Sequence, residues 1–171
     1  MFCKDILLVL DASAAGMAAV RSAAALAAAH EAHLTALYLG YDPITAFAES
    51  QLPAELLQQH QDRLERAEHD ARSAFEETCR TAGVSAEWRS AWRAQTSELM
   101  LSARYHDLIA MSGAASNDAD LIAHRYADSV VIAAGRPVLL FPESWQWGEG
   151  FRRIMVAWDG SREATRALHD A

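Results

Sequence analysis

Three residues of types that often bind metals follow one another at helical spacing: Asp120, His124 and Asp128. Residues four apart share one face of a helix, so two carboxylates and an imidazole would lie in a row. A transition metal accepts such ligands, but no pattern elsewhere in the sequence supplies a further ligand to complete a site. We therefore interpret the row as a solvated helix face and predict no metal site.

Asp11 is a second candidate for chemistry, because it directly follows the continuous apolar run of residues 6–10. Such a run is typical of a strand buried on both faces. Open parallel sheets bind ligands beyond the carboxyl ends of their strands, where Asp11 would lie. Alternatively, Asp11 belongs to the start of the next helix, which Ser13 can cap. Both interpretations remain open at this point.

The sequence lacks the common catalytic motifs of α/β enzymes. It contains no Gly-x-Ser-x-Gly nucleophile motif and no phosphate-binding loop with its lysine. Lys4 is the only lysine in the chain. It lies at the start of the first expected strand, away from any place where a lysine would contact phosphates or form a Schiff base. We predict a protein that is not an enzyme and has no catalytic residues.

Composition limits the partners further. The chain has 171 residues, of which 51% are hydrophobic and 22% are charged, with a formal net charge of −8. An acidic balance argues against nucleic acid or an anionic membrane as the main partner. No apolar run approaches the ~20 residues that span a bilayer. Cys3 and Cys79 have no metal-site or disulfide spacing, which favours a cytoplasmic protein with reduced thiols.

Strand-like and helix-like segments alternate along the chain, which predicts a parallel sheet with helices on both faces and right-handed crossovers. Residues 84–92 alternate with period two and carry one charged face, so this strand should lie at an edge. The expected strands are 6–10, 33–40, 84–92, 107–111 and 137–141, and the expected helices are 17–30, 54–82, 97–105 and 119–134.

The end of the chain repeats its beginning. Residues 152–171 align with residues 4–23 without a gap, with Asp159 on Asp11 and Ser161 on Ser13. A repeat whose period is a whole domain predicts a tandem arrangement. We expect a first domain over residues 1–142, a linker over 143–151, and the first strand and helix of a second domain over 152–171.

The segments ILLVLD (6–11), IMVAWDGS (154–161), DLIAMSG (107–113) and ADSVVIAAGRPVLLF (127–141) resemble the universal stress protein family. This resemblance implies an open, Rossmann-like five-stranded parallel sheet in the order 3-2-1-4-5, similar to adenine nucleotide alpha hydrolases. Many members dimerise through the fifth strand, and many bind ATP or AMP. We therefore expect a homodimer through residues 137–141 and the C-terminal tail, residues 152–171.

The family's nucleotide signature is a Gly, two residues, a Gly, nine residues, and a Gly followed by Ser or Thr. Here the first glycine position falls on Ser112, and the second falls on Ala115, or on Ala114 with a one-residue gap. Counted back from Pro137 without a gap, the closing pair falls on His124 and Arg125. Close approach of the backbone to phosphates depends on those glycines. We expect a non-catalytic stress-response scaffold with a degenerate site and no cofactor. The alternative is an ATP- or AMP-binding switch that uses Asp11 and the loop of residues 112–118.

The resemblance implies five positions for such a nucleotide site, whether functional or degenerate. They are Asp11, Ala12, Leu37, Ser112 and Gly113.

Overall fold

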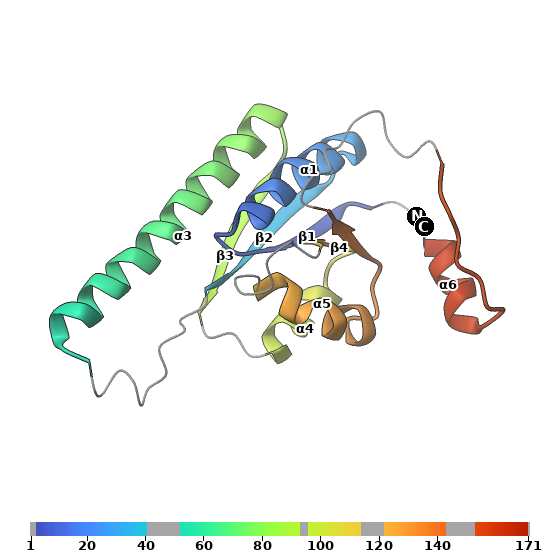
Figure 1. Cartoon of the computed structure of the whole chain (residues 1–171). Coiled ribbons are helices and arrows are strands. Elements are labelled where there is room, and N and C mark those ends of the chain that lie inside the picture. The colour runs from blue at the N-terminus through green and yellow to red at the C-terminus, as the bar shows by residue number, and fades with distance from the viewer. Residues whose placement is uncertain (1–2, 41–51, 93–95, 114–121, 143–152, 171) are drawn as a thin grey trace.

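A computed structural model gives the architecture of the chain (Figure 1). It describes residues 3–40, 52–92, 96–113, 122–142 and 153–170, with only the backbone described for Thr96 and residues 122–125. Most of the 112–118 loop, the first residues of the helix expected over 119–134, and the 143–151 linker lie outside the described residues.

Five strands form one parallel sheet in the order β3-β2-β1-β4-β5, as the sequence predicts. β3 and β5 lie at the two edges, which confirms the expected edge position of residues 84–92. The strands are β1 (Asp5–Leu10), β2 (His33–Gly40), β3 (Ala86–Trp92), β4 (Leu108–Ser112) and β5 (Val138–Phe141).

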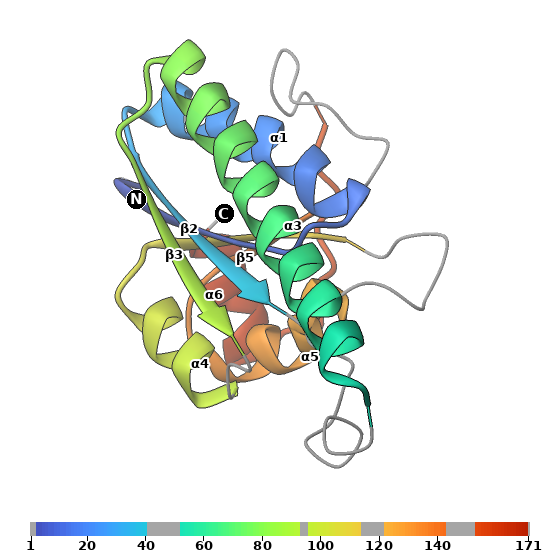
Figure 2. The ribbon, with the colours of Figure 1, turned by 90° about the vertical axis from the view of Figure 1, so that its left-hand side faces the viewer.

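Helices cover both faces of the sheet. α1 and α3 pack on one face, and α4 and α5 lie on the other (Figure 1). α3 runs obliquely across the sheet on the side of β2 and β3 (Figure 2). The helices are α1 (Ala14–His30), α3 (Ala54–Ala82), α4 (Thr96–Arg104), α5 (Ile122–Ala133) and α6 (Arg162–Asp170).

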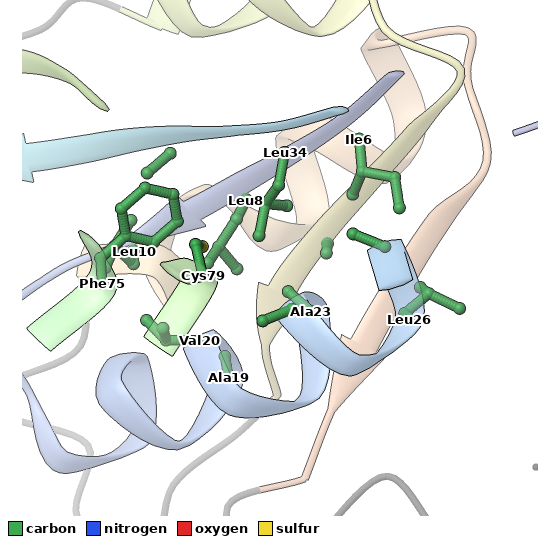
Figure 3. Packing of buried hydrophobic residues seen from close by; sticks show 14 of the residues in the cluster. Ile6, Leu8, Leu10, Ala19, Val20, Ala23, Leu26, Leu34, Phe75 and Cys79 are labelled. Atoms are coloured by element: carbon green, nitrogen blue, oxygen red, sulfur yellow. The ribbon is translucent and has the colours of Figure 1, made fainter. Parts of the chain in front are cut away.

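β1 is the centre of the core. Alternate side chains of this strand point to opposite faces, and both faces are covered, so an unbroken apolar run is required. Its residues 6–10 are all 0% exposed. Ile6, Leu8 and Leu10 pack with α1 and α3 (Figure 3), whereas Leu7 and Val9 pack with α4 and α5.

The predicted cap of the first helix is confirmed. Ser13 is the N-cap of α1, and its hydroxyl accepts a hydrogen bond from the N–H of Gly16. Gly83 ends α3 with a φ of 67°, a left-handed conformation that glycine adopts without steric cost.

The only lysine has a structural role at the opposite end of the sheet from Asp11. Lys4 Nζ donates hydrogen bonds to the carbonyl oxygens of His30 (2.9 Å) and Glu31 (3.4 Å), where α1 ends. A cation is favourable there because the helix dipole is negative at its C-terminus.

The strand predicted within residues 152–158 is wrong. The described backbone from 153 to 158 forms no strand, although the helix predicted after Ser161 is present as α6. The aligned strand, β1, is hydrogen-bonded to a strand on each side. No strand flanks residues 153–158 within the part of the chain that the structure describes, and a strand without a partner is not stable. Met155 is consequently 95% exposed.

A substitution at Phe75 can test the packing of α3 on the sheet. Its ring is buried and lies 5.6 Å from that of Trp88, measured between centroids. Phe75→Ala should lower the free energy of unfolding by about 3–5 kcal/mol, because it removes apolar contacts and leaves a cavity. Leu56→Ala, at an exposed position of the same helix, should change it by less than about 0.5 kcal/mol. Urea denaturation followed by tryptophan fluorescence measures both, and similar losses in the two variants would contradict the packing described.

Candidate functional site

The carboxyl ends of β1 and β4 bring four of the five candidate residues to one edge of the sheet. These strands are neighbours, with Val9 in register with Met111. Asp11 follows Val9 by two residues, and Gly113 follows Met111 by two residues. Asp11 and Gly113 therefore lie level with each other. Asp11 and Ser112 are buried, Gly113 is half-buried, and Ala12 is exposed; these are the positions that the structure brings together.

Leu37 lies apart from these four. It is in register with Val9, inside the sheet, and it packs in the cluster formed with α4 and α5. Its side chain is buried, so Leu37 is a core residue of the sheet.

The carboxylate of Asp11 holds the start of α1. Ser13 donates its backbone N–H (2.9 Å) and its hydroxyl to Asp11 Oδ1. The Ser13 hydroxyl oxygen also accepts from the N–H of Gly16 (3.0 Å). Asp11 is only 3% exposed, and these bonds give its buried carboxylate partners within the turn.

The same turn forms again in the tail. The N–H of Ser161 donates to Asp159 Oδ1 (2.8 Å), and the Ser161 hydroxyl oxygen accepts from the N–H of Ala164 (3.0 Å). Hydrogen bonds from the hydroxyl and the N–H of Ser161 lower the pKa of Asp159. Because Asp159 is exposed, the Asp-x-Ser turn forms without burial.

Gly16 is a site residue that sequence reasoning missed. A Cβ added to it would lie 2.5 Å from the backbone oxygen of Asp11 and 2.8 Å from Asp11 Oδ1. Glycine is therefore required where the first turn of α1 packs on the end of β1. The available signal was a single glycine within an alanine-rich helix, where glycine is otherwise unfavourable.

Ser112 and Gly113 line the end of β4. The N–H of Gly113 donates to the carbonyl oxygen of Phe141 (2.6 Å), which continues the pairing of β4 with β5. The hydroxyl oxygen of Ser112 is buried and has no hydrogen-bond partner among the described residues. Buried hydroxyls usually have a hydrogen-bond partner, and nothing in the described structure around this one explains why it has none.

Tyr38 belongs to an aromatic cluster with Trp88 and Trp92 of β3. Its ring stacks on that of Trp88 at a centroid distance of 5.5 Å. Burial, followed by the negative charges of Glu68 and Asp11, raises the pKa of Tyr38 to about 12. Glu68 also accepts the indole N–H of Trp92 (2.7 Å). Tyr38 thus lies within the influence of two negative charges, Glu68 and Asp11, and a polyphosphate beside it would meet like charge.

No group of three His, Cys, Asp or Glu side chains within the described residues is placed to hold a metal ion. Of the candidate row, Asp120 and the side chain of His124 lie outside the described residues, and Asp128 is exposed.

Comparison with known proteins assigns the fold to a family. The model of the universal stress protein family matches residues 3–142. The chain belongs to the universal stress protein family. Its Rossmann-like sheet order and flanking helices are those that the resemblance in sequence predicted. No curated protein sequence gives a significant match.

Solved structures show the same fold at low sequence identity. Universal stress protein UspA from Lactobacillus plantarum is 21% identical, with a TM-score of 0.62, over 82% of this chain and 99% of that chain. A universal stress protein in complex with cAMP is 22% identical, with a TM-score of 0.55, over 84% of this chain and 100% of that chain. A universal stress protein from Archaeoglobus fulgidus DSM 4304 is 17% identical, with a TM-score of 0.64, over 95% of this chain and 60% of that chain.

Ser13 and Ser161 provide a matched pair of variants. Ser13→Ala removes the cap of α1 and the hydroxyl bond to Asp11, so the free energy of unfolding should fall by about 1–2 kcal/mol. Ser161→Ala removes the equivalent cap in the tail and should leave the unfolding of the sheet unchanged. Thermal and urea denaturation measure both. An effect of equal size in both variants would show that the Asp11 turn does not support the domain.

Proposed function

We propose that residues 3–142 form a non-catalytic universal stress protein domain that serves as a scaffold and dimerisation unit, with a degenerate nucleotide site. The observation that supports this proposal most strongly is the use of Asp11. Its buried carboxylate accepts two hydrogen bonds from Ser13, and Gly16 packs against it. This arrangement gives Asp11 a structural role, as the helix-start interpretation of the sequence expects.

Charge supports the same proposal. The lysine that could neutralise phosphates, Lys4, is engaged with the carbonyl oxygens at the end of α1, at the amino end of the sheet. At the carboxyl end, burial and then the negative charges of Glu68 and Asp11 raise the pKa of Tyr38. The sequence also lacks the glycines of the family signature after β4. A triphosphate would therefore find negative charge and few flexible backbone N–H donors.

ATP binding tests the proposal. The melting temperature of the whole chain should not change with millimolar ATP, AMP or cAMP, with or without Mg²⁺. A ligand at 100 times its dissociation constant would stabilise the protein by about 2.7 kcal/mol, which a thermal scan detects easily. A stabilisation by ATP that is lost in Asp11→Ala would overturn the degenerate-site proposal. A nucleotide-binding family member measured in parallel serves as the positive control.

A nucleotide-binding switch is the second candidate function, and one observation favours it. The buried Ser112 hydroxyl lies at the same edge as Gly113 and Asp11 and has no hydrogen-bond partner among the described residues. A ligand atom could provide that partner. The universal stress protein of similar fold that was solved with cAMP makes AMP-like ligands the natural probes. In this case AMP or cAMP would stabilise the chain, and Ser112→Ala would reduce the effect.

The dimerisation part of the proposal rests on exposed apolar surface along the free edge of β5. Leu140 on this strand is exposed, as are Val131 and Ile132 on α5, with Ile132 84% exposed. Monomeric proteins rarely expose contiguous apolar patches of large size. A second copy that pairs along this edge would bury them in a symmetric contact.

The tail adds to this surface. Ile154, Met155 and Trp158 are exposed, whereas their aligned residues in β1 and its end are buried. Fully burying each large apolar side chain is worth about 1.5–3 kcal/mol. We propose that the tail begins a second universal stress protein domain and joins the dimer contact.

Free Cys3 and Cys79 agree with the expected cytoplasmic location. Among the described helices, none has the length and apolar character needed to cross a membrane.

Light scattering tests the assembly. The whole chain should run as a dimer at micromolar concentration, and Leu140→Glu and Ile154→Glu should each shift it toward monomer by placing a charge in the contact. Leu56→Glu, at a comparably exposed position of α3, should leave the dimer intact. A wild-type chain that runs as a monomer, or a dimer that survives both charge substitutions, would refute the proposed contact.

A further inference from the structure

A cleft of about 530 Å³ lies at the amino end of the sheet, opposite to Asp11. It is bounded by the first residues of β1, β2 and β3 and by the C-terminal end of α4, which packs on the sheet face away from α1 and α3 (Figure 2). Pockets for small ligands have volumes of roughly 300–1,000 Å³. The cleft is therefore large enough for a small molecule and is separate from the candidate nucleotide site.

Two buried polar side chains in this cleft have acceptor atoms without partners. His106 is 7% exposed, and Thr35 is also buried. His106 Nδ1 lies 2.8 Å from the carbonyl oxygen of Ser102, and because a carbonyl can only accept, Nδ1 carries the proton. In the neutral ring Nε2 is then an acceptor. Neither this atom nor the Thr35 hydroxyl has a hydrogen-bond partner within the described residues, so both can accept from a ligand.

The charges of the cleft leave one carboxylate unbalanced. Arg89 donates to both carboxylate oxygens of Glu87, at 3.0 and 2.9 Å, and these bonds lower the pKa of Glu87. That pair is neutral as a unit. Asp5 also lines the cleft, and its carboxylate forms no hydrogen bond or ion pair among the residues that the structure describes. Among Asp5, Glu87 and Arg89, two negative charges and one positive charge line the cleft, which leaves one negative charge in excess.

The outer wall of the cleft is apolar. Leu101 and Tyr105 lie on α4 and just beyond it, and both are exposed, with Tyr105 at 77%. An aliphatic chain can pack against the leucine, and the face of a tyrosine ring attracts an ammonium group. The wall thus complements a ligand that combines a carbon chain with positive charge.

We propose that this cleft binds a small organic cation of the aliphatic amine class. The ammonium group hydrogen-bonds to the Asp5 carboxylate and to the free acceptors of Thr35 and His106. The carbon chain contacts Leu101 and Tyr105. An anionic ligand would instead meet the unbalanced carboxylate. A metal ion is a poorer occupant, because the described side chains provide no cluster of three His, Cys, Asp or Glu ligands.

Calorimetric titration of the whole chain with putrescine tests the proposal. Mildly alkaline pH keeps the imidazoles neutral, and low salt limits screening. Succinate has the same number of carbon atoms and opposite charge, and serves as the control ligand. Putrescine should bind and succinate should not. Asp5→Asn keeps the shape of the side chain and should weaken putrescine binding about fivefold, the effect expected for a partly exposed charge pair.

Asp70→Asn is the matched control variant, because Asp70 is an exposed carboxylate on α3, outside the cleft. It should bind putrescine as the unmodified chain does. Amide shifts in NMR spectra should accompany binding at Thr35 and His106. Three results would overturn the proposal: no binding of putrescine at millimolar concentration, binding of succinate instead, or an equal loss in Asp5→Asn and Asp70→Asn, which would indicate general attraction to an acidic protein.

Discussion

β1 is hydrogen-bonded to a strand on each side, and this pairing joins the two halves of the sheet. β1 pairs with β2 and β4, and both of its faces are covered by helices, so residues 6–10 are completely buried. The two core clusters meet at this strand. The tail shows what happens to a similar sequence without such partners. Its residues 153–158 form no strand, although the following Asp-x-Ser turn and helix are present.

This contrast separates local from tertiary determinants in one chain. The turn at Asp11 and the turn at Asp159 have matching hydrogen bonds, so a few neighbouring residues are sufficient for them. Strand formation needs partners that are distant in sequence. The difference explains why an acidic residue at the end of β1 does not by itself indicate a ligand. Its bonds to the start of α1 account for its position, and sites cannot be inferred from the fold alone.

Much of the fold could be predicted from the sequence, because its signals are local and strong. The apolar run of β1 and the period-two alternation in β3 each indicated the type of an element. The family resemblance supplied the strand order, which periodicity alone cannot give. The candidate site was less predictable. Leu37 lies buried in the sheet, apart from the other four positions, and Gly16 was missed, because contacts such as that of Gly16 with Asp11 depend on how a helix packs on a strand.

We propose that Asp11 serves the start of α1 and that the ends of β1 and β4 do not bind a nucleotide. The most direct measurement is an NMR titration of the whole, ¹⁵N-labelled chain with ATP and Mg²⁺, followed at the amides of Ser13, Gly16 and Gly113. We expect that these three signals do not move at millimolar nucleotide. Saturable shifts of all three together would contradict this proposal, because they would place a bound nucleotide at the edge where β1 and β4 end.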